Sequence, residues 1–142
     1  MANKEELGRN AWQQIIRLFL SNEIHDRFHA ATEAAGLPHP GSLKALLMVG
    51  DEAPPMRQLA DEMRCDASYV TGLVDTLEQA DLAEREVSPT DRRVKLIRLT
   101  PLGLQARDRA LTVLGMPPAG MQKLTVAETR SLAQLLGKMV SD

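Results

Sequence analysis

The chain has 142 residues, a length that favours one compact domain. It is 44% hydrophobic and 25% charged, as folded proteins usually are, and its formal net charge of −2 excludes a chain that is basic throughout but allows a local basic patch. The single cysteine, Cys65, excludes an intramolecular disulfide and a cysteine-based zinc cluster. No apolar run is long enough to span a membrane, and the N-terminal segment is polar and acidic, so we expect a cytoplasmic protein.

Residues 5–35 carry apolar side chains at steps of three and four, including Trp12, Ile16 and Phe19, with no Gly or Pro between 9 and 35. This spacing predicts one long helix that ends at Gly36. So long an apolar stripe is hard to cover within a small monomer. We therefore expect residues 5–36 to pack against a partner chain, together with residues 105–142.

Three shorter helical patterns follow, over residues 43–49, 56–64 and 67–81. Ser42 is the candidate cap of the first of them, and Asp66 is the candidate cap of the third. Two short helices separated by a tight turn and followed by a hairpin are typical of a winged helix-turn-helix.

The hairpin is predicted from two runs that alternate apolar and charged residues, 83–87 and 94–99. The turn formers Pro89, Thr90 and Asp91 lie between them, in a tip too long for a two-residue turn. The tip also carries Arg92 and Arg93, which suit an anionic groove better than a role in stability.

Two further helices complete the pattern. Thr100 and Pro101 are a matched cap and first helical residue, and the helix they begin is expected to run to about residue 114. Thr125 and Glu128 form a capping box that begins the last helix. The fold class is therefore mostly α (α+β), with a winged-helix lobe at 38–104 flanked by long dimerisation helices, all within one domain of residues 1–142.

Several segments carry a resemblance to the MarR family of transcription regulators. They are Leu59-Ala60, the start of a helix at 68–71, the run 73–82, and above all 91–103, which reads Asp-Arg-Arg-Val-Lys-Leu-Ile-Arg-Leu-Thr-Pro-Leu-Gly. The last segment resembles the wing signature of the family, which is Asp, any residue, Arg, an alternating strand and then Leu-Thr-x-x-Gly. The helix order and the length also fit, so the resemblance covers essentially the whole chain.

The resemblance implies a homodimeric DNA-binding regulator, usually a repressor, that places two recognition helices in successive major grooves of a pseudo-palindromic operator. The wings would reach the flanking minor grooves. Arg93 matches the wing arginine that enters the minor groove, Arg92 is a candidate phosphate contact, and Asp91 would orient Arg93 or pair with a cation near the recognition helix. An ordinary turn aspartate remains an equal alternative for Asp91.

The outward face of the predicted recognition helix supplies further candidate DNA contacts, joined by cations on neighbouring segments. The full set is Ser68, Tyr69, Thr71, Gly72, Asp75, Thr76, Arg57, Arg64, Arg85, Arg92, Arg93 and Lys95. The chain departs from the family pattern here, because residues 65–84 contain no Lys or Arg. The usual contact between arginine and guanine is therefore excluded from this helix, and affinity is expected to depend on the flanking arginines and strongly on salt.

The resemblance also implies a small aromatic or amphipathic effector that binds in a cleft between the two lobes, with Trp12, Phe19, His25 and His29 as candidate lining residues. His25 and His29 share a helix face, but no further ligand pattern supports a metal site, and we expect no cofactor. We expect Cys65 to be a buried structural thiol rather than a redox sensor. No constellation typical of an enzyme is present. The alternative to a regulator is a winged-helix interaction module that has lost specific DNA binding.

Overall fold

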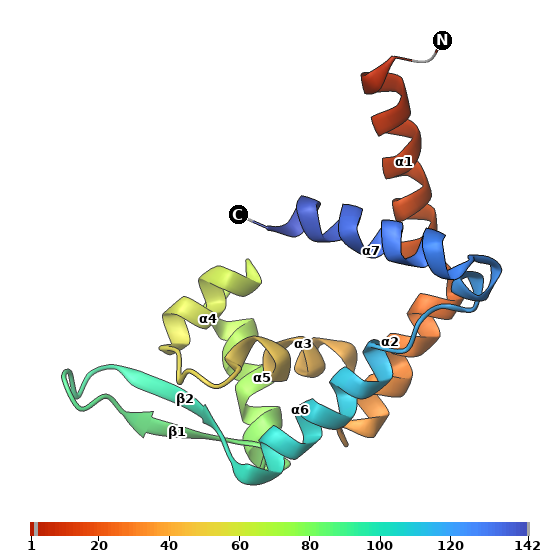
Figure 1. Ribbon diagram of the computed structural model, residues 1–142. Coiled ribbons are helices and arrows are strands. Elements are labelled where there is room, and N and C mark those ends of the chain that lie inside the picture. Colours follow the sequence, from red (N-terminus) through yellow and green to blue (C-terminus); the bar gives the residue numbers. More distant parts are fainter. Residues whose placement is uncertain (2, 142) are drawn as a thin grey trace.

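The structure is a computed structural model that describes residue 1 and residues 3–141. Over these residues the chain forms seven α-helices, one short 3-10 turn and one two-stranded antiparallel sheet. Figure 1 shows a lower lobe that ends in a projecting hairpin, and two terminal helices that lie above it. The predicted mostly α (α+β) winged helix-turn-helix is confirmed.

The elements follow in chain order. They are α1 (Lys4–Phe19), α2 (Asn22–Ala34), α3 (Pro40–Val49), α4 (Met56–Met63), α5 (Ala67–Gln79), β1 (Ala83–Val87), β2 (Lys95–Leu99), α6 (Pro101–Leu114), the 3-10 turn η1 (Ala119–Lys123) and α7 (Val126–Val140). We call α3–α5 with the hairpin, residues 40–99, the winged-helix lobe, and we call α1 and α7 the terminal helices.

One continuous apolar core holds the winged-helix lobe together. Leu46, Leu59, Leu77 and Ile97 are fully buried in it, one from each of α3, α4, α5 and β2. The core also includes alanines from α2 and α6, such as Ala31 and Ala106, so the packed unit extends past both ends of the lobe. Small residues there let α2 and α6 approach the lobe and each other closely, as the two helices do in Figure 1.

The hairpin is tied to the body of the lobe. Its register pairs Ala83 with Leu99 and Val87 with Lys95. The Ile97 N–H donates to the Pro54 carbonyl at 2.9 Å, so the loop before α4 runs along the outer edge of β2. This contact occupies part of an edge that would otherwise be free to pair with another strand. The wing is thus fixed at its base while its tip projects (Figure 1).

The prediction of one helix over residues 5–35 is wrong, because the chain breaks between α1 and α2. Leu20 ends α1, and Ser21 adopts extended backbone (φ −70°, ψ 151°) with its hydroxyl accepting from the Ile24 N–H at 3.4 Å. A serine in this position satisfies a free N–H at a new helix start. The missed signal was Ser21 followed by Asn22 and Glu23, since neither Gly nor Pro marks the break.

Other local predictions differ in detail. His39 rather than Ser42 caps α3, and Ser42 lies inside the helix, buried, with its hydroxyl donating to the His39 carbonyl at 2.6 Å. Asp66 is the residue before α5, but its side chain makes no capping bond. Cys65 is only partly buried, because it lies in the turn between α4 and α5, where its thiol donates to the Met63 carbonyl at 3.3 Å.

The two predicted caps near the C-terminal half are confirmed. The Thr100 hydroxyl accepts from the Gly103 N–H at 3.0 Å, with Pro101 as the first residue of α6. At α7 both halves of the capping box are present between Thr125 and Glu128. These bonds satisfy N–H groups that a helix cannot pair internally.

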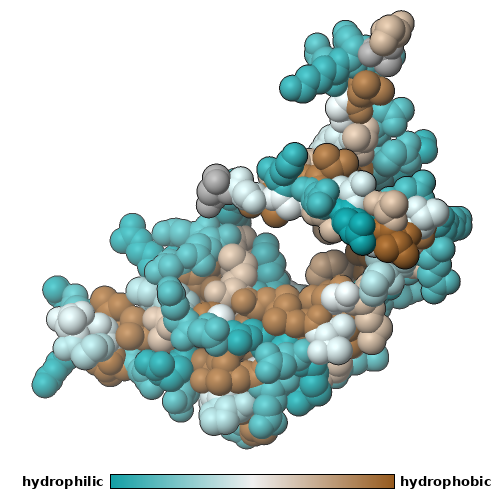
Figure 2. Space-filling model, in the orientation of Figure 1, coloured by the Kyte–Doolittle hydropathy of each residue, from teal (hydrophilic) through white to brown (hydrophobic). Residues whose placement is uncertain are grey.

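The terminal helices stand apart from this core. None of residues 4–19 of α1 or 126–140 of α7, all of which the structure describes, is buried. Figure 2 shows an opening between α7 and the winged-helix lobe, and apolar side chains exposed along α1. Glu23 and Arg27 of α2 secure the connection to α7: Glu23 accepts from the Ala119 N–H at 2.7 Å, and Arg27 donates to the Met116 and Pro117 carbonyls.

Among the helices of the described residues, none combines the length and the apolar character needed to cross a membrane.

Candidate nucleic-acid interface

The helix α5, which we call the recognition helix, buries one face and presents the other to solvent. Val70, Leu73, Val74 and Leu77 lie in the core at the helical spacing that the sequence predicts. The predicted contacts Ser68, Tyr69, Thr71, Gly72 and Asp75 are all exposed, and Thr76 is half-buried. The structure therefore brings these six residues onto the outward side of one helix.

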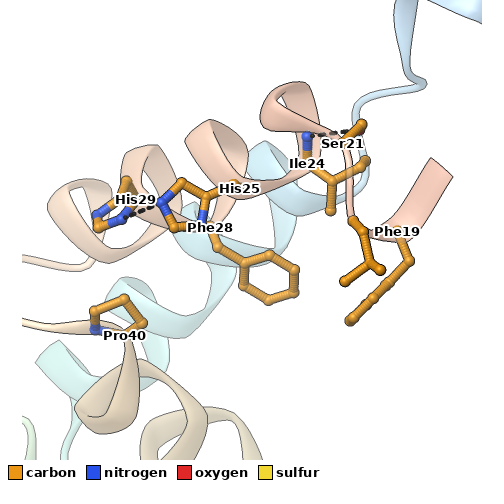
Figure 3. A pocket seen from close by; sticks show the side chains of 8 residues that line it. Phe19, Ser21, Ile24, His25, Phe28, His29 and Pro40 are labelled. Atoms are coloured by element: carbon orange, nitrogen blue, oxygen red, sulfur yellow. Dashed lines mark hydrogen bonds between the residues drawn. The ribbon is translucent and has the colours of Figure 1, made fainter. Parts of the chain in front are cut away.

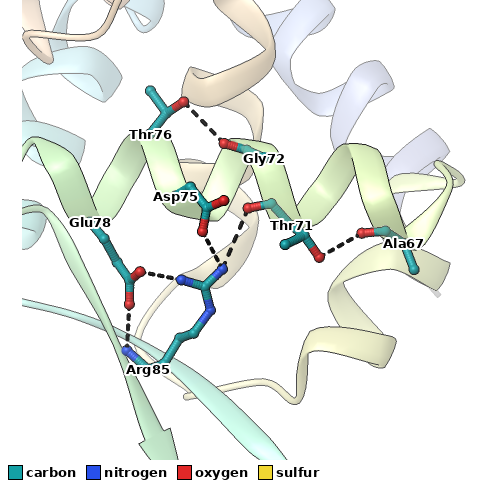
Figure 4. Close-up of polar contacts among 7 residues, drawn as sticks. All are labelled: Ala67, Thr71, Gly72, Asp75, Thr76, Glu78 and Arg85. Atoms are coloured by element: carbon teal, nitrogen blue, oxygen red, sulfur yellow. Dashed lines mark hydrogen bonds and ion pairs between the residues drawn. The ribbon is translucent and has the colours of Figure 1, made fainter.

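The two threonines on this face use their hydroxyl protons within the helix. Thr71 Oγ1 donates to the Ala67 carbonyl at 2.8 Å, and Thr76 Oγ1 donates to the Gly72 carbonyl at 3.1 Å (Figure 4). Each threonine can then offer only the lone pairs of its hydroxyl oxygen and its methyl group to the outside. A Cβ at Gly72 would meet no atom of another segment within 4 Å, so the outward side of the helix is open at this position.

Arg85 reaches from β1 to the recognition helix and holds two carboxylates there (Figure 4). Its Nη2 donates to Asp75 Oδ1 at 2.6 Å, its Nη1 donates to Glu78 Oε2, and its backbone N–H donates to Glu78 Oε1 at 3.1 Å. Nη2 also approaches the Thr71 carbonyl at 3.5 Å. The Arg85 side chain is only 24% exposed, so it binds the wing to the helix rather than projecting from the surface.

The tip of the wing presents a different kind of arginine. The side chain of Arg93 is 92% exposed, and Asp91 Oδ1 accepts from both its backbone N–H, at 3.0 Å, and its Nε, at 3.3 Å. Asp91 therefore contacts Arg93, through both its backbone and its side chain. The Asp91 contact uses Nε and leaves both Nη groups available, and Arg92 beside them is also exposed.

Three more predicted cations are exposed on the winged-helix lobe: Arg57 on α4, Arg64 after α4 and Lys95 at the start of β2. Arg64 has φ 52° and ψ 43°, a left-handed conformation that ends α4 and turns the chain toward the recognition helix. These side chains are free of ion pairs among the described residues, unlike Arg85.

Beneath the α1–α2 break lies a cavity of about 350 Å³. Phe19, His25 and His29, three of the four residues expected at an effector cleft, line it, whereas Trp12 lies elsewhere on α1 and is exposed. Figure 3 shows Phe19 and Phe28 on opposite sides of the space and the two imidazoles side by side, with their Nε2 atoms 3.1 Å apart.

The sequence prediction missed several residues of these sites. Phe28 and Pro40 line the cavity, and Glu78 shares Arg85 with Asp75. The i, i+3 spacing of Asp75 and Glu78 on one helix was the available signal for the shared arginine. No group of three or more metal-binding side chains occurs among residue 1 and residues 3–141.

Comparison with known proteins agrees with this geometry. The model of the MarR family matches residues 49–95, from the end of α3 to the start of β2. The chain is also 30% identical over 132 residues to the HTH-type transcriptional regulator MgrA of Staphylococcus aureus, a match that covers 92% of this chain and 83% of MgrA. The chain belongs to the MarR family.

Membership makes this MarR-family chain a winged-helix transcriptional regulator that binds DNA. Two solved structures share its fold. YusO of Bacillus subtilis is 24% identical with a TM-score of 0.68, and each chain is covered over 97% of its length. A mutant of S. aureus MepR, bound to an oligodeoxyribonucleotide, is 20% identical with a TM-score of 0.62, over 91% of this chain and 95% of MepR.

Proposed function

We propose that this MarR-family regulator is a homodimeric repressor of a pseudo-palindromic operator, released by a small amphipathic ligand. In this proposal each recognition helix enters a major groove and each wing enters the adjacent minor groove. Family membership and the oligodeoxyribonucleotide bound to MepR support binding to DNA. The two copies present the same elements to two half-sites about one duplex turn apart, roughly 34 Å.

The observation that carries the proposal is the wing tip. Arg93 is almost fully exposed at the end of a hairpin whose base is fixed to the core, and Asp91 fixes its backbone and Nε. A guanidinium held this way suits the strongly negative potential of a narrow minor groove. The exposed face of the recognition helix, without cations, leaves the wing and the flanking arginines as the main source of electrostatic attraction.

Exposed apolar surface on the terminal helices supports the homodimer. Trp12 and Phe19 on α1 and Leu135 and Met139 on α7 are all more than half exposed. The two helices also border an open apolar groove of about 950 Å³. Contiguous apolar surface of this kind is typical of an association site, and a second copy would cover it.

The cavity at the α1–α2 break supports a ligand-binding role. Its volume of about 350 Å³ and its mixture of phenylalanine and histidine side chains fit a small aromatic molecule with one polar group. Its lining residues come from the end of α1, from α2 and from Pro40, the first residue of α3. The cavity therefore lies where a terminal helix meets the winged-helix lobe. A ligand bound there can shift one relative to the other.

The test is a salt titration of binding to a duplex from upstream of the gene that encodes this chain, beside a scrambled duplex. We expect tighter binding to the native duplex, a steep fall with salt, and a loss of about 1–3 kcal/mol for Arg93→Ala. Arg9→Ala is the matched control, because Arg9 is an exposed arginine on α1 with only a weak pair to Glu5 at 3.7 Å.

Each alternative result has a definite meaning. An Arg93→Ala variant that binds as well as the wild type contradicts the role of the wing. If the chain binds neither duplex at low salt, the proposed operator binding is contradicted. The alternative of a winged-helix interaction module that has lost specific DNA binding is then favoured. Sedimentation of the free chain as a monomer at the concentrations used for binding contradicts the homodimer.

A further inference from the structure

The outward face of the recognition helix is unusual in what it offers to DNA. Residues 65–84 supply no Lys or Arg, and the hydroxyl protons of Thr71 and Thr76 are already bonded to backbone carbonyls. The middle of this face consists of the threonine methyl groups, the lone pairs of the threonine hydroxyls and the open Cα side of Gly72. Its strongest single polar group is the carboxylate of Asp75.

Asp75 and Glu78 both bind Arg85, but they differ in what remains free. Both oxygens of Glu78 accept hydrogen bonds from Arg85. Asp75 uses only Oδ1, and its Oδ2 has no hydrogen-bond partner among the described residues. The Asp75 side chain is 50% exposed against 32% for Glu78, so Asp75 alone keeps an acceptor available at the surface (Figure 4).

The edges of the bases in the major groove decide what such an acceptor can recognise. Donors there are the N4 amino group of cytosine and the N6 amino group of adenine, whereas guanine presents two acceptors. Adenine also presents N7 beside its amino group, and this lone pair repels a carboxylate. Cytosine itself presents no acceptor in the major groove, so a carboxylate prefers cytosine.

We propose that Asp75 is a specificity-determining residue that accepts a hydrogen bond from the N4 amino group of one cytosine in each half-site. Arg85 is the positioning residue: it fixes Oδ1 and thereby directs Oδ2, and it offsets the charge that two carboxylates would otherwise bring close to the phosphates. The inference rests on the proposed placement of the recognition helix in the major groove.

In the experiment, the full-length wild type, Asp75→Asn and Glu78→Gln each select duplexes from a library with randomised half-sites. Sequencing the bound duplexes gives the base preference at each position. An asparagine keeps the size, and its Oδ1 can still accept from Arg85, but its Nδ2 then presents N–H donors where Asp75 presents Oδ2. Such donors bind N7 and O6 of guanine or N7 of adenine. We expect Asp75→Asn to change one position in each half-site from cytosine to a purine, with a preference of about 5-fold or more, and to leave the other positions unchanged.

Glu78→Gln is the matched control, because it removes the same charge from the same arginine but leaves Asp75 in place. It is expected to keep the cytosine. In Arg85→Gln the ratio of cytosine to guanine affinity at that position is expected to fall, while ratios at other positions persist. A purely structural role of Arg85 would lower affinity for all sequences alike.

Two outcomes overturn the proposal while leaving the regulator function intact. One is an identical base preference for the wild type and Asp75→Asn. The other is loss of the cytosine in Glu78→Gln, which would mean that net charge rather than Asp75 itself determines the preference. If the wild type selects no sequence above the scrambled background, the proposed operator binding fails, and the role of Asp75 fails with it.

Discussion

The winged-helix lobe and the terminal helices differ in how they use their apolar side chains. The lobe buries at least one large side chain from each of α3, α4, α5 and β2 in a shared core. The terminal helices bury none, although their apolar residues recur at helical spacing. The same sequence pattern thus corresponds to a completed core in one region and to exposed surface in the other, a difference that fits the proposed homodimer.

The largest expected effect comes from the core of the lobe. Leu46 is fully buried in α3, so Leu46→Ala removes buried methyl groups and leaves a cavity. We expect the free energy of unfolding to fall by about 2–5 kcal/mol, measured by urea denaturation. The exposed Leu102 on α6 is the control, and a change as large for Leu102→Ala would contradict the contrast between core and surface.

Gly103 tests the junction between the wing and α6. A Cβ at this position would lie far inside contact distance of the Leu82 carbonyl oxygen. We expect Gly103→Ala to cost about 1–3 kcal/mol of stability, because two backbone segments must separate to admit a methyl group. Gly120→Ala is the control, since a Cβ there meets open space. Equal unfolding midpoints for the two variants would contradict the packing.

Leu135 on α7 tests whether the terminal helices contribute to association rather than to the stability of the monomer. Leu135→Ala alters a 58% exposed side chain, so the unfolding free energy of the dilute monomer is expected to change by about 0.5 kcal/mol or less. Self-association measured by sedimentation velocity should weaken. Unchanged association, or destabilisation of the monomer comparable to that of Leu46→Ala, would show that α7 does not act as an interface.

The smallest expected effect concerns the start of α7. Hydrogen bonds from the Thr125 backbone N–H and hydroxyl hold the pKa of Glu128 below its ordinary value of 4.5. A carboxyl group with a lowered pKa stabilises the helix above that ordinary value and loses this contribution as pH falls through the folded pKa. We expect helicity measured by circular dichroism to decrease on acidification in this range. Glu128→Gln should lack this step, and an identical acid profile would contradict the role of the cap.

Local signals could be predicted from the sequence where they depend on neighbours in the chain. Thr100, Pro101 and the capping box at Thr125 fall into this class, because cap chemistry spans only three or four residues. The break at Ser21 was missed because the apolar spacing runs on across it. The arrangement of Asp75, Glu78 and Arg85 joins a helix to a strand, so the sequence identified Asp75 and Arg85 as candidates without showing that each binds the other.

The placement of Trp12 has a practical consequence for spectroscopy. It is the only tryptophan of the chain, it is 56% exposed, and it lies on α1, whereas the only tyrosine, Tyr69, lies on the recognition helix. Intrinsic tryptophan emission will therefore respond chiefly to what covers α1, and hardly to events at the wing. If the proposed homodimer covers α1, excitation of Trp12 alone will report its formation, in the same sample in which a labelled duplex reports DNA binding.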